Sequence, residues 1–172
     1  MQITAAVDMT AAALVAEVGA IDYLFASEPR AKTGRDTDVR RGLLAAWGGY
    51  GLTDANCFHD ARAGDATGAP AVGVWSLTAQ CKAHSGANRG RTDDGELASL
   101  EDISTAMDYI RNRKPRIVIV ENVCTGWVAL GITCLLGGIR GYTWKTTALD
   151  PLSDMGEPMS RERQFWVGVL DM

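Results

Sequence analysis

Short apolar runs alternate with amphipathic stretches along this chain, a pattern typical of α/β proteins. The apolar runs predict seven short strands, at residues 3–7, 23–26, 56–59, 71–75, 116–120, 142–149 and 164–170. Helical spacing predicts helices at residues 11–18, 43–47, 100–110 and 127–136. We therefore expect a mostly parallel, twisted sheet with helices on both faces and an antiparallel last pair of strands.

Local signals predict where these elements begin and end. Ser99 and Asp102 have the spacing of a capping box, so the third helix should begin there, and Pro115 should end it. Residues 30–41 are strongly charged and should form a connection ahead of the short helix that contains Trp47.

Acidic residues follow the first three predicted strands: Asp8, Glu28 and Asp60. In an open α/β sheet the carboxyl ends of the strands line the ligand-binding crevice. An acid about twenty positions after the first strand is where such folds bind the ribose hydroxyls of a nucleoside, and Glu28 has that position. A solvated acid is the alternative, because Met-Thr-Ala-Ala replaces the glycine-rich turn of these folds.

Cys81 and Glu121 follow two later strands, so both are expected at the same edge of the sheet. A cysteine there is well placed to act as a nucleophile. Free cysteines are usually buried and inert, which is one alternative. Another is a cysteine enzyme of a different class, which acts on a small substrate with His59 or His84 as the base.

The composition limits the possible classes of protein. With 172 residues, 47% of them apolar, the chain can bury the core of a single globular domain. Four cysteines without C-x-x-C spacing predict neither a metal site nor a disulfide framework, and no apolar run is long enough to span a membrane. The net charge of −4 allows only a local nucleic-acid surface, as at Arg89, Arg91, Arg111, Arg113, Lys114 and Arg116.

Three stretches, in this order, resemble the central motifs of the DNA (cytosine-5) methyltransferase family. They are the loop from Cys81 to the Asn-Arg-Gly at 88–90, KPRIVIVENV at 114–123, and GYTWKTTALDPLSDMGEPMSRERQFWVGV at 141–169. The resemblance runs from about Asp8 to the end of the chain and is nearest to phage and prophage members. It implies a Rossmann-like, S-adenosylmethionine-dependent methyltransferase fold.

The resemblance also implies a role for each catalytic candidate. Cys81 would add to C6 of a cytosine flipped out of the duplex, and Glu121 would form a hydrogen bond to N3 of that base. Asn122 would hold the turn after the strand. Arg161 and Arg163 would contact the base oxygen, the backbone or Glu121, and would favour the thiolate.

The cofactor implied in this way is S-adenosylmethionine, and the implied partner is DNA. Glu28 would bind the ribose hydroxyls, Asp60 the adenine amino group, and Asp8 would lie near the methionine end. Residues 82–97 would form a mobile loop that closes over the flipped base. In that loop, DNA phosphates would be held by Ser85, Arg89 and Arg91. The expected setting is the cytoplasm of a bacterial or phage-infected cell.

Residues 1–70 would then form the cofactor half of one domain and residues 71–172 its catalytic half, with no target-recognition domain. A second chain could supply recognition. The alternative is a degenerate relative that binds DNA, cofactor or a partner without chemistry. Three departures from the family pattern favour that alternative: a first motif without glycine, Gln80 in place of the usual proline, and Met159 at the first position of the Gln-x-Arg-x-Arg pattern.

Overall fold

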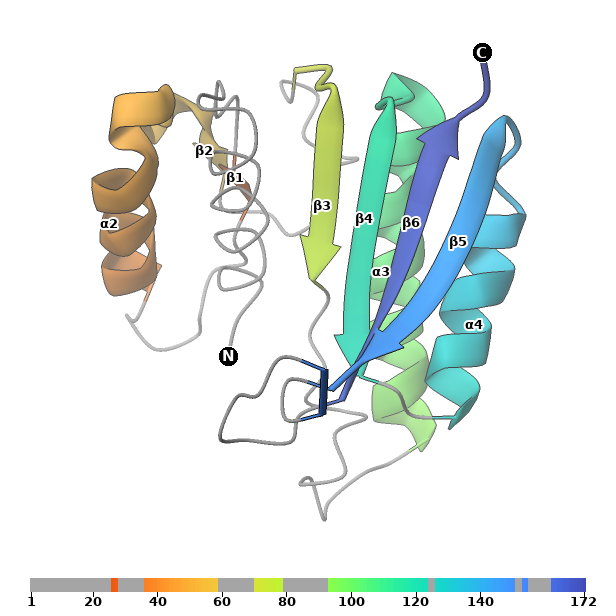
Figure 1. Cartoon of the computed structure of the whole chain (residues 1–172). Coiled ribbons are helices and arrows are strands. Elements are labelled where there is room, and N and C mark those ends of the chain that lie inside the picture. The colour runs from red at the N-terminus through yellow and green to blue at the C-terminus, as the bar shows by residue number, and fades with distance from the viewer. Residues whose placement is uncertain are drawn as a thin grey trace.

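The computed structural model describes residues 26–27, 36–58, 70–78, 93–123, 126–150, 153–154 and 162–172. These residues form two sheets and the helices beside them (Figure 1). The larger sheet has the strand order β3-β4-β6-β5 and contains β3 (Val74–Thr78), β4 (Ile117–Val123), β5 (Tyr142–Leu149) and β6 (Arg163–Leu170). No helix in this described part is long and apolar enough to cross a membrane.

One strand of the larger sheet, β6, is reversed. β3 pairs with β4 in parallel, whereas β6 is antiparallel to both β4 and β5. β3, β4 and β5 therefore run in the same direction, and their carboxyl ends lie at the edge where β6 begins (Figure 1). This is the mixed α/β, Rossmann-like arrangement that the sequence predicts, with an antiparallel last pair of strands.

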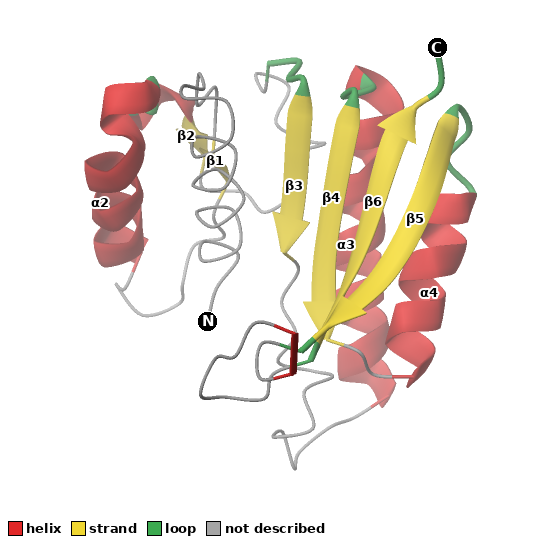
Figure 2. Cartoon of the chain, in the orientation of Figure 1, coloured by secondary structure: helices red, strands yellow, loops and turns green. Residues whose placement is uncertain are grey.

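α3 (Asp93–Arg113) and α4 (Gly126–Gly137) cover the same face of the larger sheet (Figure 2). Because side chains alternate between the two faces of a strand, every second residue of β4 points toward these helices. Val118 and Val120 are the core residues on that side of β4. The helices bury against them Ile103, Met107 and Ile110 from α3, and Val128, Ile132 and Leu136 from α4.

Two of the core aromatic residues, Trp166 and Tyr109, have partners for their polar tips. Trp166 Nε1 donates a hydrogen bond to Thr133 Oγ1 at 2.9 Å, which links β6 to α4. Tyr109 of α3 stacks on Trp75 of β3, with 5.4 Å between the ring centroids, and its hydroxyl donates to the carbonyl of Pro70. These bonds avoid the cost of burying an unpaired donor, about 1–3 kcal/mol each.

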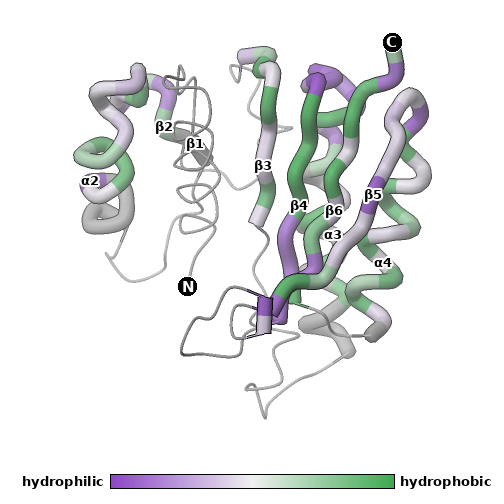
Figure 3. Tube along the Cα trace, viewed as in Figure 1, coloured by the Kyte–Doolittle hydropathy of each residue, from purple (hydrophilic) through white to green (hydrophobic). Residues whose placement is uncertain are grey.

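Hydropathy changes along β4. Its first part is apolar and β-branched, which favours a buried strand, whereas its carboxyl end is hydrophilic (Figure 3). α4 is apolar along most of its length in the same view. β4 thus carries polar side chains from the core to the edge of the sheet.

The N-terminal part of the described chain holds the smaller sheet. Its elements are β1 (Ala26–Ser27), α2 (Asp36–Trp47), two short 3₁₀ helices (Gly48–Tyr50 and Asp54–Asn56) and β2 (Cys57–Phe58). β1 and β2 pair in parallel, so their carboxyl ends meet at one edge. Leu43 and Trp47 are the buried residues of the last turns of α2.

Several predicted elements are confirmed. β5 has the predicted bounds, β2 lies within residues 56–59, α4 covers residues 127–136, and Ile103, Met107 and Ile110 form the buried face of α3. α3 ends at Arg113, shortly before Pro115. The strand predicted at residues 3–7 and the helix predicted at 11–18 lie outside the described residues.

Two predicted helix starts are wrong. α2 begins at Asp36, so residues 36–41 are helical rather than a connection. α3 begins at Asp93 rather than at Ser99, so residues 93–97 belong to a helix and not to a closing loop. The sequence has acidic residues at both starts, DTD at 36–38 and DD at 93–94, and acidic residues favour the first turn of a helix.

The predicted strand ends also need correction. The strand expected at residues 71–75 runs from Val74 to Thr78, because that segment is the one in register with β4. β4 continues to Val123, since β6 pairs with it as far as Arg163. Glu121 and Arg163 therefore lie inside strands, where the sheet holds them more rigidly than loops would.

Candidate active site

Polar side chains from β4 and β6 meet at the carboxyl end of β4. In the strand register Glu121 lies opposite Thr78 of β3 and opposite Phe165 of β6. β6 begins at this edge with Arg163, which lies opposite Val123. Three strands thus bring residues to one edge, which is where open α/β sheets bind ligands.

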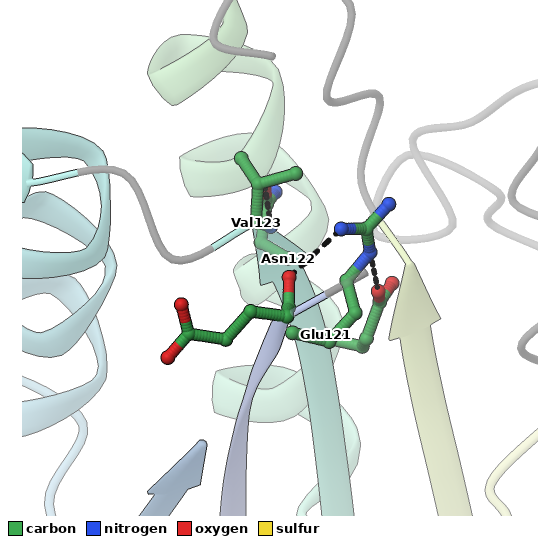
Figure 4. A network of polar contacts seen from close by, with 5 residues as sticks. Glu121, Asn122 and Val123 are labelled. Atoms are coloured by element: carbon green, nitrogen blue, oxygen red, sulfur yellow. Dashed lines mark hydrogen bonds and ion pairs between the residues drawn. The ribbon is translucent and has the colours of Figure 1, made fainter. Parts of the chain in front are cut away.

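Glu121 and Arg163 form an ion pair across β4 and β6 (Figure 4). Arg163 Nε lies 2.8 Å from Glu121 Oε1, and only 17% of the arginine side chain and 11% of the glutamate side chain are exposed. Arg163 is two positions from Phe165, the register partner of Glu121, so the two charged side chains share a face and meet diagonally. Arg163 Nη1 also donates to the carbonyl of Glu162 at 2.9 Å.

This ion pair orients the Glu121 carboxylate more than it stabilises the fold. Charges shielded from water attract strongly, but their loss of hydration opposes that gain. Arginine holds a carboxylate in a defined geometry because its donors are fixed in a plane. The main-chain contact of Arg163 fixes the guanidinium from a second direction. The carboxylate is therefore held ready at the edge of the sheet.

Asn122 lies next to this pair and is 1% exposed (Figure 4). Its Oδ1 accepts a hydrogen bond from the Val123 N–H at 2.7 Å, whereas its Nδ2 has no hydrogen-bond partner in the described structure. β4 extends through Asn122, and the residues that follow the strand, 124–125, lie outside the described part, so the role of Asn122 in holding the turn stays a prediction. A buried amide donor without an acceptor costs about 1–3 kcal/mol, so its presence calls for an explanation.

Cys81 lies outside the described residues, but the chain limits how far it can be from Glu121. It follows Thr78, the last residue of β3, by three positions. Three extended residues span at most about 11 Å. Thr78 and Glu121 are directly paired, and neighbouring strands are about 5 Å apart. This tether is compatible with Cys81 and Glu121 contacting the same small ring.

The other predicted site residues outside the described ranges are Asp8, Glu28, Asp60, Ser85, Arg89, Arg91 and Arg161. In the sequence, Glu28 directly follows β1 and Asp60 comes two positions after β2. The parallel register places Ser27 opposite Phe58. Ser27 comes one residue before Glu28 in the chain, and Phe58 comes two residues before Asp60. The two acids are thus attached to strand ends at one edge, and their binding of a nucleoside stays a prediction.

Two contributors to this edge were not among the predicted site residues. Thr78 is paired with Glu121 in the strand register. The sequence could have identified Thr78, because it ends the strand that comes directly before the candidate nucleophile. Glu162 contributes through its main-chain carbonyl, which no side-chain pattern reveals. Within the described ranges no group of His, Cys, Asp and Glu could hold a metal ion.

Comparison with known proteins shows the fold. No protein-family model and no curated protein matches the chain. The crystal structure of S. pombe Dnmt2 methyltransferase matches 96% of this chain and 48% of its own, with 19% identity and a TM-score of 0.60. A prophage-encoded protein from E. coli described as a DNA modification methyltransferase matches 71% of this chain and 34% of its own, with 14% identity and a TM-score of 0.49. The Entamoeba histolytica methyltransferase EhMeth matches 58% of this chain and 32% of its own, with 18% identity and a TM-score of 0.39.

The S. pombe match extends over nearly the whole chain, and the chain spans about half the length of that methyltransferase. Together with the reversed strand β6 between β4 and β5, it shows that this chain has the α/β fold of the matching half of that methyltransferase.

Proposed function

We propose that this chain is the catalytic domain of a DNA (cytosine-5) methyltransferase. The observation that carries the proposal is the shielded ion pair between Glu121 and Arg163 at the carboxyl edge of β4. Cys81, the proposed nucleophile, is tethered three residues beyond Thr78, which is paired with Glu121. The order of the motifs and the methyltransferase fold support the same activity.

The chemistry explains why a thiolate and a carboxyl group are needed together. C5 of cytosine is a weak nucleophile until a thiolate has added to C6. As the Cys81 sulfur bonds to C6, the electrons of the C5–C6 double bond form a C4–C5 double bond. The electrons of the C4–N3 double bond pass to N3, which takes a proton from the acid form of Glu121. The carboxylate of the ion pair gains that proton from solvent before the addition. Glu121 is left as a carboxylate, and C5 becomes nucleophilic.

Arg163 favours this proton transfer. Its guanidinium stabilises the carboxylate that Glu121 becomes, because a charge-assisted hydrogen bond is stronger than one to the neutral acid. The second contact of the guanidinium, to the carbonyl of Glu162, holds it in place before the reaction begins. Such preorganised charge needs no rearrangement when the negative charge develops.

The remaining roles rest on residues outside the described ranges. S-adenosylmethionine, when bound, would supply the electrophilic methyl group to which C5 donates its electrons. Its proposed ligands are Asp8, Glu28 and Asp60, two of which follow the paired strands β1 and β2 in the sequence. Proposed contacts to the flipped cytosine and its phosphates come from Arg161, Ser85, Arg89 and Arg91.

Trapping with 5-fluorocytosine tests this function. Fluorine at C5 cannot leave as a proton does, so an enzyme that has added to C6 and transferred the methyl group stays bonded to the DNA. The chain should form an adduct that survives denaturation when S-adenosylmethionine is present, and Cys81→Ser should abolish it. Cys134→Ser, which changes an exposed free cysteine on α4, is the matched control and should leave the adduct unchanged.

Two results would contradict the proposal. One is the absence of any adduct, also after addition of a candidate recognition chain. The other is an adduct that persists in Cys81→Ser, since the bond would then involve another residue.

A further inference from the structure

The amino-terminal edge of the larger sheet, at the other end of β4 from Glu121, carries a group of exposed cationic side chains. We call this group the basic edge, and it consists of Arg111, Arg113, Lys114, Arg116 and Arg140. β4 has seven residues, so this edge is about 20 Å from the carboxyl edge that holds the candidate active site.

Main-chain and side-chain hydrogen bonds bring the separate parts of the basic edge together. The Tyr142 hydroxyl donates to the carbonyl of Pro115 at 2.6 Å, which joins the turn after α4 to the turn after α3. The Leu170 N–H donates to the carbonyl of Arg116 at 3.0 Å. Arg140 is two residues before Tyr142, and Lys114 is directly before Pro115. Residues from three segments of the chain therefore converge.

Most of the positive charge on this edge is uncompensated. Arg111 pairs with Asp108 at 2.6 Å, whereas the other four cations form no ion pair within the described structure. Among the residues that the structure describes, Asp171 is the second carboxylate side chain at this edge, and it accepts a hydrogen bond from Thr143. Five cations against these two carboxylates leave a side-chain charge of +3, on a chain whose net charge is −4.

The helix dipole accounts for only part of the basic edge. Positive side chains in the last turn of a helix interact favourably with its carboxyl end, and Arg111 and Arg113 are in that position in α3. The effect falls off beyond the last turn. Arg116 directly precedes β4, and Arg140 comes three residues after the end of α4. These two need another explanation.

Lys114 adds an independent observation. Its φ of 48° is in the left-handed region. Among the residues that the structure describes, Lys114 is the one residue other than glycine that has a positive φ. Its N–H bonds to the carbonyl of Ile110 at 3.0 Å, so it occupies the position after a helix where glycine is most common. A side chain there costs about 1–2 kcal/mol, a cost that a functional ammonium group would justify.

We propose that the basic edge binds the sugar–phosphate backbone of a nucleic-acid duplex, as a second contact surface remote from the candidate active site. Neighbouring helices are about 8–10 Å apart, so the cations at the ends of α3 and α4 are too widely spread for one small anion. Duplex DNA presents a negative charge about every 1.7 Å along its axis and can meet all of them. Nothing in this binding requires methyl transfer.

Salt-dependent binding to a duplex of A·T pairs tests the proposal, because that duplex has no cytosine for the candidate active site. The full chain is compared with the variant Arg113→Gln/Lys114→Gly/Arg116→Gln/Arg140→Gln. Each lost phosphate contact should reduce the slope of log K against log salt by about 0.9. We expect the slope to fall by about 2–4 and the affinity near 100 mM salt to fall at least about tenfold.

Lys114→Gly alone separates binding from folding. Glycine accepts the left-handed backbone without strain, so this variant should melt at an equal or higher temperature while binding the duplex more weakly. Lys145→Gln is the matched control: it removes the same charge from the exposed middle of β5 and should leave binding unchanged.

Three outcomes would overturn the proposal. The first is that the unaltered chain does not bind the duplex. The second is that Lys145→Gln loses as much binding as the quadruple variant. The third is that a polyglutamate peptide displaces the bound duplex at a lower concentration of charge than unlabelled duplex does. The last result would assign the basic edge to an acidic protein partner.

Discussion

Arg163 and Glu121 lie on neighbouring antiparallel strands, and Arg163 is two positions from Phe165, the residue directly opposite Glu121. The charged groups of Arg163 and Glu121 are 2.8 Å apart. Val120 and Trp166, at alternating positions of the same strands, face the helices and are buried in the core. The ion pair is therefore on the other face of the sheet. Because the sheet separates the pair from the core, it can be changed without opening a cavity there.

A double-mutant cycle should show that this pair is coupled. Arg163→Met should lower the free energy of unfolding by about 1–3 kcal/mol, because it leaves the shielded Glu121 carboxylate without its counter-charge. Arg163→Met combined with Glu121→Gln should cost less than the sum of the two changes, by about 1–3 kcal/mol. Urea unfolding at pH 7 measures all four proteins.

The exposed pair between Arg111 and Asp108 provides the comparison. Its atoms are 2.6 Å apart, but half of the aspartate side chain and 38% of the arginine side chain are exposed. Water screens such a pair, so its coupling energy should be below about 0.5 kcal/mol. Equal coupling in the two pairs would show that shielding does not strengthen the contact between Glu121 and Arg163.

Asn122→Leu should separate activity from stability. Leucine has a similar volume, and the change removes both the unpartnered Nδ2 and the bond from Val123 to Oδ1. These two effects oppose each other, so stability should change by less than about 1 kcal/mol. If Nδ2 gains its acceptor when the DNA is bound, formation of the 5-fluorocytosine adduct should slow by at least about tenfold, or 1.4 kcal/mol. An unchanged adduct rate would make Asn122 a structural residue only.

The sequence predicts the strands of the larger sheet because two signals coincide there. β4 and β5 are rich in residues that favour strands, and β4 is also buried by the helices, so local preference and burial agree. The starts of α2 and α3 were missed because the charged sequences that begin at Asp36 and Asp93 look like solvated connections when read one residue at a time. Acidic residues favour the start of a helix only through the dipole of the whole helix, which a residue-by-residue reading leaves out.

The candidate active site could be predicted only in part. The motif order singles out Glu121 and Arg163, but it leaves three possible contacts for the arginine. Which one forms depends on the register between β4 and β6, strands that are about forty residues apart in the chain. That Nδ2 of Asn122 lacks a hydrogen-bond partner depends on all the atoms around it in the folded protein. A periodic pattern in the sequence does not contain this information.

Alkaline pH should destabilise the protein through Tyr109. Burial raises the pKa of its phenol from 10.0 to about 12, although the nearby charge of Arg113 opposes the shift. The unfolded chain releases this proton near pH 10, whereas the folded chain keeps it until about pH 12. Stability is therefore fully present below pH 10 and falls as the pH rises toward 12. Two pKa units correspond to about 2–3 kcal/mol.

Tyr109→Phe should remove this part of the pH dependence. The variant should be about 1 kcal/mol less stable at pH 8, because the carbonyl of Pro70 loses its donor, but it should lose less stability between pH 8 and 11.5. Urea unfolding at both pH values measures the difference. Burial also raises the pKa of Tyr142, which adds an alkaline loss to both proteins and so cancels in the comparison. Parallel losses in the two proteins would show that Tyr109 is not the group responsible.

Gly168→Ala should destabilise the larger sheet. A Cβ at this position would lie 2.5 Å from the ring of Trp144, closer than atoms can approach, and Trp144 is itself stacked on Tyr142 with 5.5 Å between the centroids. We expect a loss of about 1–3 kcal/mol, measured by thermal and urea unfolding. In the background of Trp144→Leu the added methyl group has space, so Gly168→Ala should then cost little. Gly42→Ala in α2 is the control: nothing lies within 4 Å of its Cβ, and alanine should stabilise that helix by up to about 1 kcal/mol. If Gly168→Ala were as stable as the unaltered chain, Trp144 would not pack against β6 as the structure shows.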